Sequence, residues 1–163
     1  MTYFRTLVFA LLAGFLPAVA AAQGAQVAFG VVQQNAGLPV EVTADNLAVD
    51  QDTGEAIFTG NVVIGQGEMR LSADRVLVVY RQDPNGVERI EATGNVVLVS
   101  GTDAAESQKA DYNVDDGTIV MTGSVLLAQG PSALSADRMT VQLESGTAQM
   151  SGSVRTILQT GDQ

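Results

Sequence analysis

The sequence predicts an all-β protein, a creased and twisted antiparallel sheet of about four repeated hairpin units with open edge strands. Two short motifs alternate along the chain, and a turn signal follows in each unit. Beyond the N-terminal segment no stretch shows sustained helical periodicity. We therefore expect ~13–16 short strands in a single domain.

The first 22 residues have the layout of a secretory leader. Arg5 is followed by an uncharged apolar run at residues 7–16, a break at Pro17 and small residues up to Ala22. The run is too short to cross a bilayer core of ~30 Å, although an uncleaved membrane anchor is the alternative. We expect cleavage after Ala22, export to the periplasm and one domain over residues 23–163.

Composition excludes most catalytic chemistry. The chain has no Cys and no His, so it offers no thiolate nucleophile, disulfide or histidine ligand. Only Arg5 is charged in the expected leader, which leaves seven basic residues against 18 acidic ones. Nucleic acid is a poor partner for that balance, because phosphate neutralisation needs clustered Lys and Arg. We predict no catalytic residue, no metal, no cofactor and no enzymatic activity.

The repeat consists of an Ala-Asp pair and a Gly-(Asn/Ser)-Val triplet. The pairs begin at Ala44, Ala73, Ala110 and Ala136, and the triplets begin at Gly60, Gly94, Gly123 and Gly152. Turn residues that favour positive φ stand between them and end at Gly54, Gly86, Gly117 and Gly146. Each turn is predicted to be the tip of a β-hairpin.

Alternation around each triplet predicts which side chains share a face, because every second residue of a strand points the same way. The apolar residues and the glycine are expected to point inward. In the Ala-Asp strands the parity slips, so we expect an extra residue at the Asp that creases the sheet. Asp45, Asp74, Asp111 and Asp137 are expected to bind backbone N–H groups there. The predicted inner residues are Phe58, Val62, Ile64, Val96, Leu98, Met121, Val125, Leu127, Met139 and Val141.

The enclosed face predicts either a groove for aliphatic chains or a closed core of small aliphatic residues. Each buried methylene is worth ~0.8 kcal/mol, so a lipid chain needs no positive charge to bind. Edge strands expected at residues 27–32 and 154–159 contain one charge, Arg155, and favour head-to-tail pairing of copies. The expected partner-edge residues are Val27, Phe29, Val31, Val154, Thr156 and Leu158.

The motifs at residues 39–45, 58–62, 71–76 and 121–125 resemble those of the lipopolysaccharide-transport family LptA, of the OstA-like fold. The resemblance covers about residues 38–158. It implies a β-jellyroll that carries lipopolysaccharide across the periplasm, with the lipid A acyl chains inside and the sugars in water. The implied partners are an LptC-like inner-membrane protein and an LptD-like outer-membrane protein. The resemblance also adds the lipid-contacting residues Val40, Val42, Tyr112 and Val114.

Two other functions stay open from the sequence. One is a structural periplasmic β-filament or scaffold with a closed core and no ligand. The other is a hydrolase using paired carboxylates, against which the repetition of the Asp residues argues. Residues 50–55 resemble part of a calcium loop, but Asn61 stands where a bidentate Glu is needed, so we interpret them as a hairpin turn.

Overall fold

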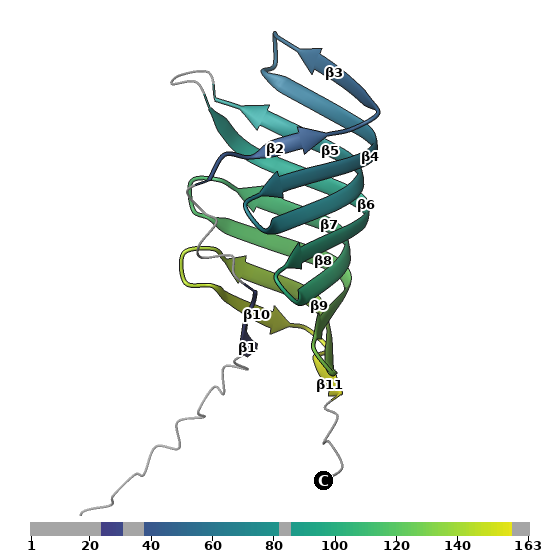
Figure 1. Ribbon diagram of the computed structural model, residues 1–163, viewed down its shortest axis with the longest axis vertical. Coiled ribbons are helices and arrows are strands. Elements are labelled where there is room, and N and C mark those ends of the chain that lie inside the picture. Colours follow the sequence, from purple (N-terminus) through teal and green to yellow (C-terminus); the bar gives the residue numbers. More distant parts are fainter. Residues whose placement is uncertain (1–23, 31–37, 82–85, 158–163) are drawn as a thin grey trace, which may run out of the picture.

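The structure is a computed structural model that describes residues 24–30, 38–81 and 86–157. Over these ranges the chain forms one antiparallel sheet of 11 strands and no helix (Figure 1). The all-β prediction is confirmed, but the strands are fewer and longer than expected because the central ones continue through the crease. The strands are β1 (Ala25–Ala28), β2 (Glu41–Thr43), β3 (Asn46–Asp50), β4 (Glu55–Gln66), β5 (Met69–Tyr80), β6 (Val87–Ser100), β7 (Asp103–Asn113), β8 (Thr118–Gln129), β9 (Ser132–Gln142), β10 (Thr147–Ser151) and β11 (Arg155–Ile157).

The sheet is folded over on itself into two layers. Its order is β1-β10-β9-β8-β7-β6-β5-β4-β2, while β3 also pairs with β4 and β11 also pairs with β9. Short β2 and β3 are thus the two halves of one strand, as are β10 and β11. We define the front layer as β2, β11 and the halves of the long strands that lie in register with them. The back layer consists of β3, β10 and the halves of the long strands in register with those two strands. Figure 1 shows the long strands crossing between the layers along one side of the molecule.

A β-bulge creates the crease in every pair of long strands. Between β4 and β5 the ladder stops at Thr59 and resumes at Val62, so that Gly60 and Asn61 oppose Asp74. The same irregularity recurs across the sheet. The extra residue therefore lies in the Gly-(Asn/Ser) strand, and its predicted place at the Asp is wrong. Gly60 and Asn61 have φ angles of 81° and 48°, which glycine and asparagine adopt most readily.

Each crease glycine faces the neighbouring strand's polar side chain rather than the interior, which corrects the predicted inward orientation. A Cβ on Gly60 would stand 2.7 Å from Asp45 Oδ2. The crease carboxylates accept hydrogen bonds from the side chain of the residue that follows the glycine, and not from the backbone N–H groups that were predicted. Asn61 Nδ2 donates to Asp45 Oδ2 at 2.8 Å, and Ser153 Oγ donates to Asp137 Oδ2 at 3.1 Å. Because the glycine has no Cβ, the carboxylate reaches the backbone and ties the bulge to the next strand.

The third crease position is occupied by Gln108 and not by the predicted Asp111. A Cβ on Gly123 would stand 2.8 Å from Gln108 Cβ, whereas Asp111 pairs with Val120 in the regular back-layer ladder. Asp45, Gln108 and Asp137 each stand 15 residues before their glycine. This 15-residue spacing could have identified Gln108 from the sequence. The Ala-Asp pair at residues 110 and 111 does not lie at a crease.

Hairpin turns lie at the free tips of both layers. The predicted turns at residues 51–54, 114–117 and 143–146 connect back-layer halves and are confirmed; the fourth lies partly outside the described residues. In the first, the Asp50 carboxylate accepts the N–H groups of Asp52 and Thr53 at 2.9 and 3.2 Å, as in a self-capped turn. The front-layer turns at Gly67, Gly101 and Gly130 were not predicted, because one glycine at each is a weaker signal.

The predicted edges are partly wrong. Strand β1 pairs with β10, so Val27 lies at the same end of the sheet as Val154 rather than at the opposite end. The edge at the other end is formed by β2 and β3. Val31 and Leu158 lie outside the described residues.

We predict that Gly94→Ala lowers the free energy of unfolding by about 2–3 kcal/mol, because it adds left-handed strain and an overlap. Gly94 has a φ of 81°, and its Cβ would stand 3.0 Å from Asp74 Cβ. Gly130→Ala is the matched control, since it has a φ of 53° and nothing within 4 Å, and should cost about 1 kcal/mol. Urea unfolding measures both, and equal losses would contradict a role for the crease contact.

Candidate functional site

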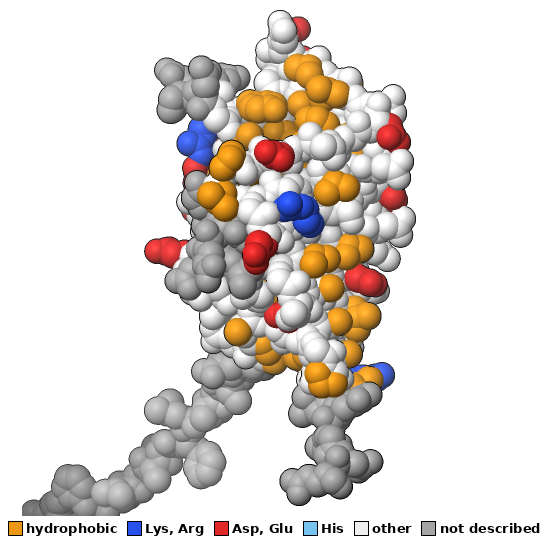
Figure 2. Space-filling model, in the orientation of Figure 1, with side chains coloured by type: hydrophobic (Ala, Val, Ile, Leu, Met, Phe, Trp, Pro, Cys, Tyr) orange, Lys and Arg blue, Asp and Glu red, His pale blue; other side chains and the backbone are white. Residues whose placement is uncertain are grey.

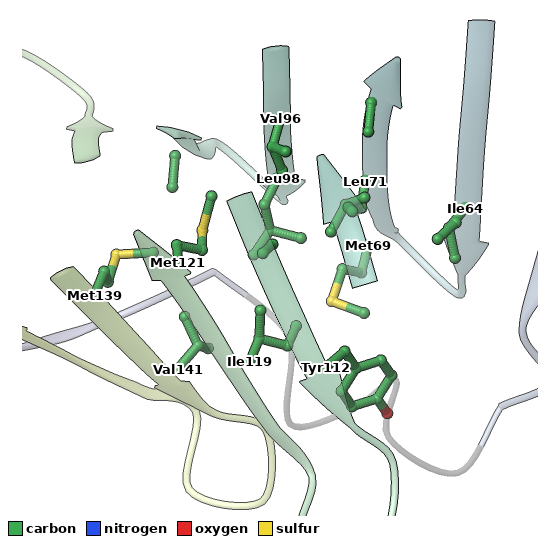
Figure 3. Packing of buried hydrophobic residues seen from close by; sticks show 14 of the residues in the cluster. Ile64, Met69, Leu71, Val96, Leu98, Tyr112, Ile119, Met121, Met139 and Val141 are labelled. Carbon is green, nitrogen blue, oxygen red and sulfur yellow. The ribbon is translucent and has the colours of Figure 1, made fainter. Parts of the chain in front are cut away.

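The candidate site is the space between the two layers, which runs the length of the folded sheet. Side chains from both layers project into it, as Figure 3 shows for Leu71, Leu98, Met121 and Met139. These belong to one hydrophobic cluster of buried residues that reaches from β4 to β10. The repeat therefore produces a continuous apolar interior instead of several separate cores.

Most of the predicted inner residues do line this space. Val40, Val42, Phe58 and Val114 are half-buried and pack against the cluster. At the C-terminal end the pattern fails, since Val154 is 40% exposed and Thr156 is also exposed. The fully buried ones are Val62, Ile64, Val96, Leu98, Tyr112, Met121, Val125, Leu127, Met139 and Val141.

A small cavity lies between the layers beneath Val40. Its free volume is only about 20 Å³, which is room for roughly one water molecule. The protein's own side chains fill most of the space at this place, so an acyl chain fits here only if the layers part. The lining residues are Val40, Ile64, Gln66, Met69, Leu71, Ile90, Ala92, Ala110, Tyr112 and Ile119.

Seven of the lining residues were not among the predicted lipid-contacting residues. They are Gln66, Met69, Leu71, Ile90, Ala92, Ala110 and Ile119. Ile90 and Ala92 could have been found by extending the alternation back from Gly94. Gln66 could not, because a polar residue in an inward position reads as a break in the pattern.

Gln66 supplies a polar contact at the mouth of the cavity. It is 4% exposed, and its Nε2 donates to the Leu38 carbonyl at 2.9 Å. Burial raises the pKa of Tyr112 above its usual value, and a side-chain hydrogen bond with Gln66 opposes that rise. Gln66 ends β4 in the front layer and Tyr112 lies in the back layer, so this contact joins the two layers across their open side.

Apolar side chains are exposed at the β3 end of the molecule. Leu47 and Val49 are 57% and 61% exposed although they pair with Phe58 and Ala56, which are on the inner face. Figure 2 shows hydrophobic side chains gathered at this end. The inner surface of the sheet therefore continues to an uncovered end.

Charge and metal chemistry add little to the site. Among the described residues no cluster of three or more acidic side chains could hold a metal ion. Within those ranges there is also no helix able to span a membrane. The crease carboxylates of Asp45, Asp74 and Asp137 are exposed on the outer surface, away from the apolar interior.

Fold and site together define an open, two-layered antiparallel β-jellyroll with an apolar interior. A solved structure has this fold: LptH, described as the LptA homologous periplasmic component of the conserved lipopolysaccharide transport device from Pseudomonas aeruginosa. It superposes with a TM-score of 0.68 at 15% identity, covering 77% of this chain and 98% of that chain. The predicted fold class is confirmed.

Sequence comparison identifies the family. The family described as LptA/(LptD N-terminal domain) LPS transport protein matches residues 41–147. The chain belongs to this family, and the predicted resemblance is confirmed. An uncharacterised protein of Rhizobium meliloti (strain 1021) is 30% identical over 116 residues, which are 67% of this chain and 62% of that protein.

Two further relatives match over shorter segments. LPS-assembly protein LptD of Salmonella choleraesuis (strain SC-B67) is 45% identical over 62 residues, 36% of this chain and 8% of that protein. Lipopolysaccharide export system protein LptA of Escherichia coli (strain K12) is 32% identical over 56 residues, 34% of this chain and 30% of that protein. The chain thus spans 62% or less of the length of these relatives.

We predict that Tyr112→Phe lowers the free energy of unfolding by about 1 kcal/mol at neutral pH, because it removes a partly buried hydrogen bond. The pKa of Tyr112 is raised in the folded protein, so the unfolded chain ionises first as the pH passes 10. The wild type therefore loses stability from about pH 10 upward, and the variant loses less. Urea unfolding across pH measures this, with Tyr80→Phe, at an exposed tyrosine, as the control. Parallel pH curves for the wild type and Tyr112→Phe would contradict it.

Proposed function

We propose that the protein carries lipopolysaccharide by holding its acyl chains between the two layers. The observation that carries this proposal is the single apolar cluster that extends from β4 to β10 and continues to an uncovered end at Leu47 and Val49. Membership of a lipopolysaccharide transport family supports it. A carrier of this kind makes and breaks no covalent bonds, and we propose that the chain is not an enzyme.

Apolar burial supplies enough free energy for this task. Each methylene removed from water contributes ~0.8 kcal/mol, so a partly buried acyl chain gains several kcal/mol. Because side chains fill most of the space beside Val40, that gain must offset the parting of the layers. The balance favours reversible binding, and a carrier must also release its load. Met69, Met121 and Met139 help, since flexible thioether side chains repack around chains of variable position.

The outer surface is suited to the sugars and not to the phosphates of the lipid. Acidic residues outnumber basic ones by 18 to eight, and the crease carboxylates are exposed. Repulsion between like charges opposes close contact with phosphate groups. We therefore propose that binding depends on the acyl chains, with the headgroup left in water.

We further propose that the protein acts in the periplasm as a bridge between membrane-bound partners. The LptH description places that relative in the periplasm, and residues 1–22 have the layout of a cleaved leader. Half-strand edges at β2, β3 and β11 leave backbone groups available for another strand. An LptC-like partner at one end, an LptD-like partner at the other, and head-to-tail copies between them would each extend the interior. Val154 and Thr156 belong to this edge proposal.

The alternative is a structural β-filament with a permanently closed core. The small cavity favours it, because the described side chains leave no room for an acyl chain beside Val40. The two functions differ in whether the layers can part.

Photo-crosslinking from the inner face separates them. A photoreactive residue at Val42, whose side chain packs against the cluster, should capture lipopolysaccharide in cells. The same residue at Thr43 should not, because Thr43 is the next position on β2 and is exposed. Equal capture at both positions, or capture at neither, would contradict the carrier function.

We predict that Leu47→Ser with Val49→Ser weakens self-association or partner docking roughly tenfold, because it removes apolar contact at the uncovered end. Both residues are more than half exposed, so the free energy of unfolding should change by less than ~0.5 kcal/mol. Sedimentation velocity measures assembly. A matched pair on the outer face, Asp111→Ser with Asn113→Ser in β7, should leave assembly unchanged.

A further inference from the structure

Residues 24–30 form a segment, here named the strap, that crosses the open side of the folded sheet. Its first part is β1, which pairs with β10 in the back layer from Ala25↔Met150 to Ala28↔Thr147. Figure 1 shows β1 beside β10 at the end of the molecule opposite β3. The strap is distant in sequence from the strand that it covers.

The end of the strap is attached to the tips of both layers. Phe29 N–H donates to the Gly146 carbonyl at 3.1 Å, in the back-layer turn between β9 and β10. Gly30 N–H donates to Asp103 Oδ2 at 2.9 Å in the front layer. Gln129, the front-layer partner of Asp103, donates from Nε2 to the Ala28 carbonyl at 2.7 Å. The strap therefore ties the layers together where they would have to part.

The strap also fills interior volume. Residues Ala25 and Val27 pair with the buried residues Met150 and Ala148, so they face inward, and Phe29 follows in the same alternation. Phe29 is 0% exposed and is among the largest fully buried side chains of the described chain. Its phenyl ring therefore occupies interior volume at this end of the molecule.

Detachment of the strap disrupts little of the sheet, and the long strands keep their pairing. β1 pairs through four residues, whereas β4 and β5 pair through ten. The bonds made by Gly30 and by Gln129 to Ala28 lie at exposed positions, where water can replace the lost partners. Release of the strap therefore leaves the crease contacts intact.

We propose that the strap closes the interior and that Phe29 occupies the place of an aliphatic chain, so that loading requires the strap to detach. The chemical class of ligand for the vacated site is a saturated acyl chain. This inference rests on the proposed carrier function and adds the step that admits the lipid. Ligand and strap compete for one site, so the fraction of molecules with a released strap sets the apparent affinity.

A reversible disulfide tests the proposal. Gln26 and Gln149 pair across β1 and β10 and are both exposed, so Gln26→Cys with Gln149→Cys can lock the strap without altering the interior. The chain has no native Cys to interfere. The matched control is Glu91→Cys with Asp111→Cys, a cross-strand pair between β6 and β7 that is remote from the strap. The probe is purified lipopolysaccharide, and the readout is the rate and extent of its co-purification with the full chain.

The oxidised strap variant should load lipopolysaccharide at least roughly tenfold less than its reduced form, while oxidation of the control should change nothing. In the opposite direction, Gln129→Ala removes one attachment of the strap at the surface and should speed loading. Equal loading by the oxidised and reduced strap variant would overturn the strap proposal and leave the carrier function standing. Absence of loading by the wild type and every variant would overturn the carrier function, and the strap proposal with it.

Discussion

The fold depends on the approach of one side chain to a backbone that has no Cβ. At each crease a glycine with positive φ lets the side chain of an Asp, or of Gln108, lie against the bulge. Where that side chain is an Asp, its carboxylate accepts a hydrogen bond from the residue after the glycine, which is Asn61, Asn95 or Ser153. Repetition of this contact in neighbouring strands aligns the creases in one line. Two apolar faces of a single sheet then meet and form the interior, so that the protein needs no second sheet or helix to bury its core.

This construction explains why the interior is continuous, and it supports the proposal that the layers can part. The long strands run continuously from one layer to the other through the crease. At the free tips, the layers are held together by weaker contacts. Gln66 and Tyr112 make one such contact, and residues 24–30 make another. A hinge with a fixed crease and releasable tips suits a site that must accept and deliver an aliphatic chain.

The sequence predicted the structure well where a backbone conformation is readily adopted by only one or two residue types. Positive φ at the turns and creases required Gly or Asn, so the hairpin tips and the repeat could be located from the letters alone. Burial of Val62, Val96 and Val125 followed from the two-residue period of a strand. The assignment of Asp111 to a crease was wrong because Gln108 lies against the crease glycine instead. A search for identical residues does not detect a different side chain of similar shape.

By itself the sequence determined the all-β class, the family and the apolar inner face, because these depend on local backbone preference and on alternation along one strand. Only the tertiary structure decided where β1 lies, since its pairing with β10 joins residues from opposite ends of the chain and leaves no local signal. It also decided that the cavity beside Val40 is small, because the distance between two layers depends on how all of their side chains pack together.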